Sequence, residues 1–209
     1  MKYSFPAIIP VAIEKVTIMI IGLWSRIRTP MLCWIWGVKI GKGVIFQGKT
    51  YIRSRGYGIE IGDNVVFNSL SMSNLVGLTN ATILENRAGG RITIRNNCGF
   101  SSVVMSSKSS ISIGNRVLMG GNARIYDHDY HSLDCKVRGT AKDYALAKTK
   151  SVIIEDDVFI GTNVIILKGT RVGARSIIAA GSVLFGLSVP PDSIVKGNPA
   201  VVCGKKNEK

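Results

Sequence analysis

An aliphatic residue recurs at every sixth position between residues 154 and 183. The recurring residues are Ile154, Ile160, Ile166, Val172 and Ile178, and a small or β-branched residue follows each of them four positions later. An α-helix repeats about every 3.6 residues and a strand about every two, so neither element explains this period. A chain that turns a corner every six residues and stacks on itself does explain it. The pattern therefore predicts a solenoid.

The same frame appears upstream in shorter runs. Isoleucines open these hexads, and a large apolar residue follows each of them six positions later: Ile40 and Phe46, Ile61 and Phe67, Ile94 and Phe100, Ile113 and Met119. Three short faces per turn predict a coil of about 18 residues that rises about 4.8 Å, one strand spacing. A β-sandwich is the alternative, but its strands do not hold a phase of six over about thirty residues.

The periodicity divides the chain into three parts. Residues 1–37 lack the six-residue period and form a hydrophobic, helical segment. Residues 38–183 are predicted to form a parallel β-helix, interrupted at 126–150 by a loop that leaves the coil. Residues 184–209 form a C-terminal extension with a basic tail. The predicted fold class is all-β, a single-stranded parallel β-helix with a protruding loop, and long loops in compact domains are usually functional.

Residues 1–36 have two open interpretations. The uninterrupted apolar run from Val16 to Trp24 is too short to span a bilayer, and no signal-peptide cleavage pattern follows it. The segment is either an interfacial helix, with tryptophans at the headgroups of a membrane, or a helix that caps the coil or packs on a neighbouring subunit. We expect a cytoplasmic protein with peripheral contact at the inner membrane face.

Composition limits the classes of ligand that the protein is expected to bind. Lysine and arginine number 27 against 13 acidic residues, which gives a net charge of +14. A solvated surface accounts for much of this charge, and phosphate-bearing ligands or anionic surfaces also favour it. No basic stretch interleaved with aromatic residues appears, which argues against nucleic acid as a partner. The four cysteines are scattered without a CxxC pair, which favours a reducing compartment over a disulfide framework or a zinc site.

Both histidines of the chain, His128 and His131, lie in the loop that interrupts the period. The aspartates Asp127, Asp129 and Asp134 surround them. Imidazole is the side chain best suited to take a proton near neutral pH, and a nearby carboxylate fixes its tautomer. Two alternatives remain, namely solvated histidines without a role and a metal site built from the histidines and aspartates. The gathering of both histidines in this loop favours acid–base catalysis that requires no metal.

Four motifs stand out beyond the period itself. They are D-x-D-x-H-S-x-D at 127–134, VFIGTNVIILKGTRVG at 158–173, AAGSV at 179–183 and KGNPA at 196–200. Together they resemble the hexapeptide-repeat acyltransferases, and in particular the branch of sugar and polysaccharide O-acetyltransferases, over roughly residues 38–203. The resemblance implies a left-handed β-helix, a homotrimer, and acetyl-CoA bound between neighbouring subunits. It also implies a loop histidine that acts as general base on the acceptor hydroxyl.

The resemblance assigns roles to individual residues. The motif places the general base at His131, while a competing alignment selects His128, and Ser101, Asp127 and Asp129 are assigned to the acceptor. The residues assigned to CoA are Phe159, Gly161, Thr162, Lys168, Ala179, Ala180 and Lys196. Among these, the backbone N–H of Ala180 is expected to meet the pantetheine or the thioester oxygen, and the two lysines to meet the phosphates. The alternative for the apolar positions is a purely structural role in the coil.

One departure concerns the phosphate contact. Many relatives have Thr-Lys after GSV, whereas Leu184 and Phe185 stand there in this chain. The predicted function is nevertheless acetyl-CoA-dependent O-acetylation of a sugar or polysaccharide precursor, for which the hydrophobic N-terminus suggests a lipid-linked acceptor. The alternatives are N-acetylation of an amino sugar or another small amine, and a non-catalytic β-helix scaffold.

Overall fold

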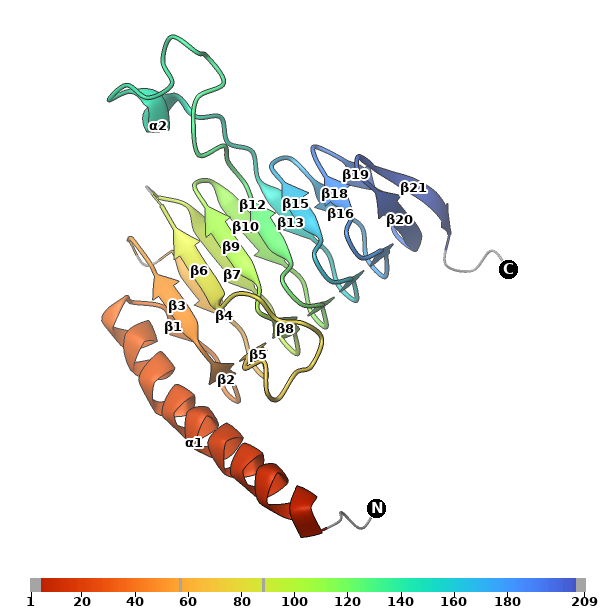
Figure 1. The fold of residues 1–209 in the computed structure, drawn as a ribbon. Helices are drawn as coiled ribbons and strands as arrows, with labels where there is room; N and C mark the ends of the chain where they lie inside the picture. The colour runs from red at the N-terminus through yellow and green to blue at the C-terminus, as the bar shows by residue number, and fades with distance from the viewer. Residues whose placement is uncertain (1–4, 57, 88, 206–209) are drawn as a thin grey trace.

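A coil of short strands forms most of the molecule in the computed structural model, which describes residues 5–56, 58–87 and 89–205 (Figure 1). The outermost four residues of the predicted N-terminal and C-terminal segments lie outside the described residues. The chain visits three sheets in turn, here called sheets A, B and C. Each sheet forms one face of the coil.

The three sheets stack equivalent strands in parallel. Sheet A contains β1 (Lys39–Ile40), β4 (Ile59–Ile61), β7 (Arg91–Ile94), β10 (Ser110–Ile113), β13 (Val152–Ile154), β16 (Arg171–Val172) and β19 (Ser188–Val189). Sheet B contains β2 (Ile45–Gly48), β5 (Val66–Ser69), β8 (Gly99–Ser101), β11 (Leu118–Met119), β14 (Phe159–Ile160), β17 (Ile177–Ile178) and β20 (Ser193–Gly197). Sheet C contains β3 (Thr50–Arg53), β6 (Thr82–Asn86), β9 (Val104–Ser107), β12 (Arg124–Tyr126), β15 (Ile165–Leu167) and β18 (Val183–Leu184).

The strand register confirms the predicted coil. Ile154 pairs with Val172, and Ile160 pairs with Ile178, so equivalent positions are eighteen residues apart. These four side chains are buried, as the inward position of each hexad requires. The fold class is therefore the predicted left-handed parallel β-helix.

An aromatic stack fills the N-terminal part of the coil. Phe46, Phe67 and Phe100 occupy equivalent positions of β2, β5 and β8 and are buried. Neighbouring ring centroids are 5.1 Å apart in both pairs. Stacked rings add favourable contacts to the burial of apolar surface, so each coil is held to the next by its inward side chains.

The stacking continues past residue 183. β19 pairs in parallel with β16, and β20 pairs in parallel with β17, before β21 (Ala200–Lys205) turns back antiparallel on β20. The inward residues Val189 and Val195 lie seventeen residues after their partners Val172 and Ile178. One interval between inward residues is therefore five residues long instead of six, although the stacking of strands persists to Gly197.

Two insertions leave the coil at opposite edges of sheet C. Residues 71–81 leave between sheets B and C, and residues 127–151 leave between sheets C and A and contain the short helix α2 (Asp143–Leu146). Figure 1 shows the first below sheet C and the second above it. The predicted loop at 126–150 corresponds to the second insertion.

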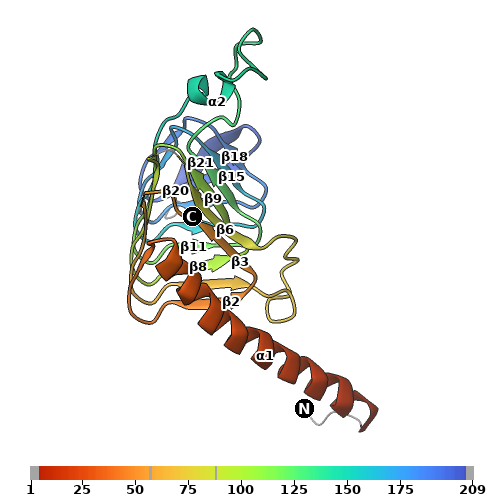
Figure 2. The same cartoon turned by 90° about the vertical axis from the view of Figure 1, so that its left-hand side faces the viewer.

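The N-terminal helix α1 (Phe5–Ile35) lies across the first coil and contacts β1, β2 and β3 (Figure 2). Its side chains Ser25, Thr29 and Cys33 are buried against these strands. Packing of the helix on the end of the coil is one of the two arrangements expected for this segment. No helix among the described residues combines the length and the apolar character needed to cross a bilayer.

Candidate active site

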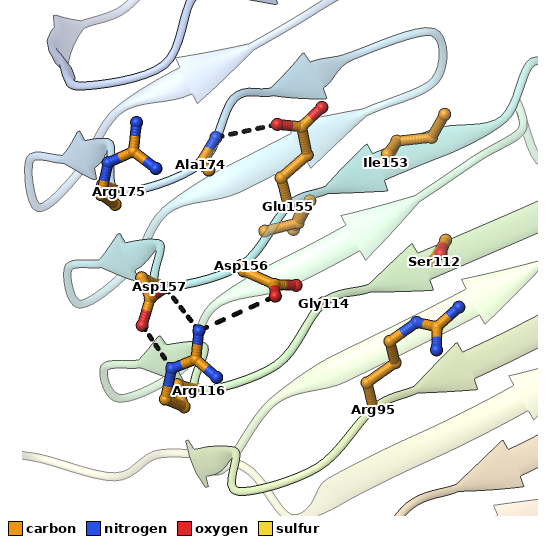
Figure 3. A pocket seen from close by; sticks show the side chains of 11 residues that line it. Arg95, Ser112, Gly114, Arg116, Ile153, Glu155, Asp156, Asp157, Ala174 and Arg175 are labelled. Atoms are coloured by element: carbon orange, nitrogen blue, oxygen red, sulfur yellow. Dashed lines mark hydrogen bonds and ion pairs between the residues drawn. The ribbon is translucent and has the colours of Figure 1, made fainter.

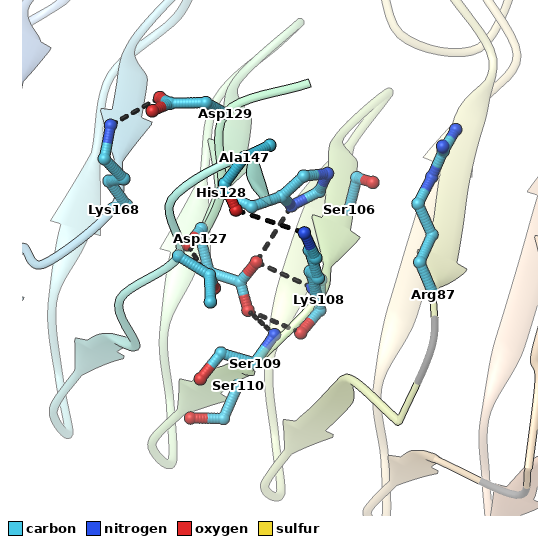
Figure 4. Close-up of polar contacts among 12 residues, drawn as sticks. Arg87, Ser106, Lys108, Ser109, Ser110, Asp127, His128, Asp129, Ala147 and Lys168 are labelled. Carbon is cyan, nitrogen blue, oxygen red and sulfur yellow. Dashed lines mark hydrogen bonds and ion pairs between the residues drawn. The ribbon is translucent and has the colours of Figure 1, made fainter. Parts of the chain in front are cut away.

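The buried carboxylate of Asp127 ties the insertion at 127–151 to the coil (Figure 4). It accepts hydrogen bonds from Ser107 Oγ at 2.7 Å, Lys108 N at 2.7 Å and Ser109 N at 2.8 Å, and it lies 2.9 Å from His128 Nδ1. Burial raises the pKa of Asp127, but these hydrogen bonds outweigh it and hold the pKa below its ordinary value. Asp127, assigned to the acceptor substrate from the sequence, is therefore buried and fixes the loop to the coil.

Replacing Asp127 with asparagine should lower the free energy of unfolding by about 1–3 kcal/mol near pH 7, because an ionised acceptor of four hydrogen bonds is lost. The stabilisation from a carboxyl with a lowered pKa is complete above its ordinary value of 3.8 and disappears as pH falls through the lower folded-state value. The difference between wild type and variant should therefore shrink below about pH 4. Urea denaturation at several pH values measures it.

Asp134→Asn is the matched control, because Asp134 lies exposed in the same loop. It should change the free energy of unfolding by less than about 0.5 kcal/mol. A destabilisation by Asp127→Asn that stayed constant down to pH 3 would contradict the role assigned to the carboxylate.

His128 is completely enclosed. Its side chain has no exposed surface, and its ring centroid lies 4.8 Å from that of Tyr130. With an ionised Asp127 as partner, Nδ1 carries the proton and donates it to the hydrogen bond. Nε2 is buried and has no hydrogen-bond partner within the described parts of the chain. An acceptor molecule therefore reaches this nitrogen only if the surrounding side chains move.

His131 forms a similar pair but faces outward. Its side chain is 71% exposed, and Nδ1 lies 2.8 Å from Asp143 Oδ2. Asp143 also accepts hydrogen bonds from Gly139 N at 2.8 Å and from Ser132 N at 2.5 Å. These N–H groups, together with the imidazole, lower the pKa of Asp143 to about 2. The carboxylate is thus ionised at neutral pH and holds one nitrogen of an exposed imidazole.

Sequence reasoning did not identify Asp143 as the partner of a histidine. It lies twelve residues after His131, at the start of α2, and the loop brings the two together. The available signal was that Asp143 is the single acidic residue in the otherwise basic stretch 136–150. A lone carboxylate among cations, near the histidines of the chain, is a reasonable candidate partner.

Asp129 and Lys168 form an ion pair beside the loop (Figure 4). Both side chains are largely buried, and the amine of Lys168 lies 4.8 Å from the centre of the Phe185 ring. This position is between sheets C and A, whereas the other residues assigned to CoA lie on sheet B or at its border with sheet C. The structure therefore places Lys168 with the loop.

A groove on sheet B contains two of the predicted residues. Ser101 and Phe159 line it together with Leu118 and Gly120, and its volume is about 320 Å³. Ser101 Oγ accepts a hydrogen bond from the amide of Asn74 at 2.9 Å, so the insertion at 71–81 reaches the same groove. The groove brings a residue assigned to the acceptor next to one assigned to CoA.

The remaining residues assigned to CoA lie at or near the border of sheets B and C. Gly161 and Thr162 follow β14, and Ala179 and Ala180 follow β17 directly above them. A Cβ atom on Gly161 would lie 2.6 Å from the backbone N of Ala180, so only glycine allows the coils to approach this closely here. Lys196 is exposed on β20 of the same sheet.

The predicted site residues thus form two groups within one chain. The loop group contains Asp127, His128, Asp129, His131 and Lys168, and the sheet B group contains the others. The width of sheet C separates them (Figure 1). The structure does not bring the candidate bases and the candidate CoA wall together within one subunit.

A cavity of about 520 Å³ on sheet A holds none of the predicted residues (Figure 3). Exposed ion pairs border it. Arg116 binds both carboxylate oxygens of Asp157, at 2.6 and 2.7 Å, and Glu155 accepts a hydrogen bond from Ala174 N. Pairs of this kind contribute little stability individually, and here they join residues of successive coils. Among the described residues, no group of three or more His, Cys, Asp or Glu side chains is placed to hold a metal ion.

Comparison with known proteins relates the chain to hexapeptide-repeat transferases. Residues 151–186 match the family model for the bacterial transferase hexapeptide, six repeats. Over 100 residues the chain is 35% identical to a galactoside O-acetyltransferase of Lactococcus lactis, covering 48% of this chain and 45% of that protein. A solved hexapeptide-repeat acetyltransferase of Vibrio cholerae is 27% identical, with a TM-score of 0.57 and coverage of 95% and 94%. The chain is therefore similar to hexapeptide-repeat acetyltransferases, over about half of its length in the curated sequence and over most of its length in the solved fold.

A second curated relative has a different acceptor. The 2,3,4,5-tetrahydropyridine-2,6-dicarboxylate N-acetyltransferase of Staphylococcus aureus is 49% identical over 57 residues, which cover 27% of this chain and 23% of that protein. The chain spans less than half of the length of these two curated relatives. They share acetyl transfer by name and differ in the atom that is acetylated.

Proposed function

We propose that this protein is an acetyl-CoA-dependent O-acetyltransferase that acts on a hydroxyl of a sugar or polysaccharide precursor, with His131 as general base. The observation that carries the proposal is the exposed imidazole of His131 held through Nδ1 by the ionised Asp143. The galactoside O-acetyltransferase of L. lactis supports the reaction and the acceptor class.

The pair defines how the proton moves. Asp143 keeps the proton of the imidazole on Nδ1, which leaves Nε2 free to accept the proton of the acceptor hydroxyl. The acceptor oxygen attacks the thioester carbonyl, and an N–H such as that of Ala180 stabilises the tetrahedral oxyanion. The intermediate collapses to the acetyl ester, and the CoA sulfur leaves with the proton from the imidazolium of His131.

Each of the two histidines has an aspartate partner on Nδ1, so this contact does not distinguish them. Their solvent exposure does. The side chain of His131 is mostly exposed, while that of His128 is fully enclosed beside Tyr130. A general base needs hydrogen-bond contact with the proton that it removes. His131 meets this requirement without rearrangement of the loop. His128 instead helps to fix the start of the loop to the coil.

A homotrimer would complete the site. In one chain the loop and the groove on sheet B lie on opposite sides of sheet C, so the candidate base does not face the candidate CoA wall of its own subunit. In our proposal the loop of one subunit faces the groove of the next, which places His131 opposite Phe159 and Ala180. Acetyl-CoA would then lie between subunits.

The test is acetyl transfer by the purified full chain. We expect CoA to raise the melting temperature, because ligand binding to the folded state stabilises it. We also expect acceptor-dependent release of free thiol from acetyl-CoA with a panel of sugars, and products that lose the acetyl group in mild alkali. Gel filtration with light scattering should give the mass of three chains.

Other outcomes distinguish the alternatives. A product that resists alkali and forms only from amines supports N-acetylation, which the S. aureus relative makes the second candidate. Absence of CoA binding together with absence of thiol release would leave the non-catalytic scaffold. A monomer that is fully active would contradict the site between subunits.

A further inference from the structure

Helix α1 packs on the coil with its small side chains. Ser25, Thr29 and Cys33 are buried and lie four residues apart, on one face of the helix. Ser25 Oγ accepts a hydrogen bond from Gly48 N at 3.1 Å, and the guanidinium of Arg28 donates to the carbonyl oxygen of Thr50 at 3.2 Å. These contacts fix which side of the helix faces the protein.

The opposite side of α1 is apolar and exposed. We call it the outer face. It comprises Ile13, Ile20, Leu23, Trp24, Ile27 and Trp34, whose exposed fractions lie between 52% and 82%. An α-helix turns about 100° per residue, which places these positions on the side away from Ser25 and Thr29. A surface helix ordinarily buries its apolar side, so this arrangement indicates that another apolar medium covers the outer face.

Basic residues border the outer face on both edges. Arg26 lies on one edge and Arg28 on the other, because a rotation of about 200° around the helix axis separates the two positions. Glu14 is the one acidic residue in the described part of the helix. The whole chain carries a net charge of +14. A second copy placed on this face would bring basic edges together, whereas an anionic surface complements them.

A cavity beside the helix provides a place for a phosphate. It has a volume of about 280 Å³ and lies between α1 and the end of β2, lined among others by Trp24, Arg28, Thr29 and Lys49. The hydroxyl of Thr29 is fully buried and has no hydrogen-bond partner within the described chain. Two cations, a free hydroxyl and an indole at the edge of an apolar face match the headgroup region of a phospholipid.

We propose that α1 anchors the protein to an anionic phospholipid membrane, with the outer face in the interface and a lipid phosphate between Arg28 and Lys49. The helix is about 46 Å long and lies in the plane of the membrane surface. The membrane then meets the end of the coil that begins with β1, and the hairpin of β20 and β21 points away from it (Figure 1).

The experiment is flotation of the full chain with two kinds of vesicle. One contains neutral phosphatidylcholine alone, and the other contains about 30% phosphatidylglycerol as the anionic lipid. We expect the protein to float with the anionic vesicles at about 0.1 M salt, at least about 10-fold more strongly than with neutral ones. The double variant Ile20→Glu/Ile27→Glu should lose this binding, because both positions lie in the middle of the outer face.

Matched controls separate the anchor from general changes in surface character. Leu75 is 88% exposed in the insertion at 71–81, and Leu75→Glu should float like wild type. Arg28→Gln/Lys49→Gln should reduce binding to anionic vesicles by about 10-fold, toward the level of the neutral ones. Arg95→Gln/Lys205→Gln removes the same charge from distant coils and should leave most of the binding.

Three outcomes would overturn the proposal. The first is no flotation with either vesicle, and the second is flotation that Ile20→Glu/Ile27→Glu leaves unchanged. The third is a molecular mass in solution twice that of the expected trimer, which falls to the mass of the trimer in this variant. The last outcome would assign the outer face to a second copy. Flotation requires neither CoA nor acetyl transfer, so its result is independent of the proposed enzymatic function.

Discussion

Replacing His131 with alanine should lower kcat for acetyl transfer by about 10²–10⁴-fold, the usual contribution of a positioned general base. CoA binding and the melting temperature should change little, because the side chain is mostly exposed and its one strong contact is with Asp143. Thiol release from acetyl-CoA under saturating acceptor measures kcat, and thermal unfolding with and without CoA provides the comparison.

Two companion variants decide between the bases. His128→Ala should weaken the loop by removing a buried ring but should retain activity in the folded fraction. Asp143→Asn should lower kcat, because the imidazole loses the carboxylate that holds its proton on Nδ1 and fixes the orientation of the ring. An inactive His128→Ala with an active His131→Ala would assign the base to His128. Activity in both histidine variants would exclude an imidazole base.

Replacing Phe67 with alanine should lower the free energy of unfolding by about 3–5 kcal/mol, as expected for a fully buried phenylalanine. Its ring has a ring on each side, from Phe46 and Phe100, with centroids 5.1 Å away. In a solenoid each coil contacts only its neighbours, so the coils at the N-terminal end should unfold first. Urea denaturation measures the total loss in the free energy of unfolding, and hydrogen exchange shows which coils open.

Phe185→Ala is the matched control for this prediction. Phe185 is 64% exposed at the border of sheets C and A, and its removal should cost less than about 1 kcal/mol. If Phe67→Ala cost no more than this control, the three rings would not hold the first coils together as described.

The coil was predictable because its inward positions must repeat at a fixed interval. Ile154, Ile160 and Ile166 obey that interval, and the strand register agrees with it. The prediction stopped at 183 because Val189 and Val195 arrive one residue early, although they still stack on Val172 and Ile178. Strands still pair when a corner between them is one residue shorter. A strict six-residue period in the sequence is broken by the same change.

The chemistry was predictable only in part. The interruption of the period located the loop and both histidines, but it contained no information on how the loop folds back on itself. The contact between His131 and Asp143 and the pairing of Lys168 with Asp129 depend on that fold. Similarly, the apolar character of residues 5–35 was visible, yet the outward turn of Ile27 follows from the burial of Ser25 and Thr29 against the coil.

The insertion at 127–151 closes where it begins. Asp127 O accepts hydrogen bonds from Lys150 N at 2.8 Å and from Thr149 Oγ1 at 2.9 Å, so the chain leaves and re-enters the coil at almost one point. The parallel pairing of strands within sheet A and within sheet C therefore does not depend on the length or content of the insertion. Evolution is free to exchange this segment for another while the coil that carries it keeps its register.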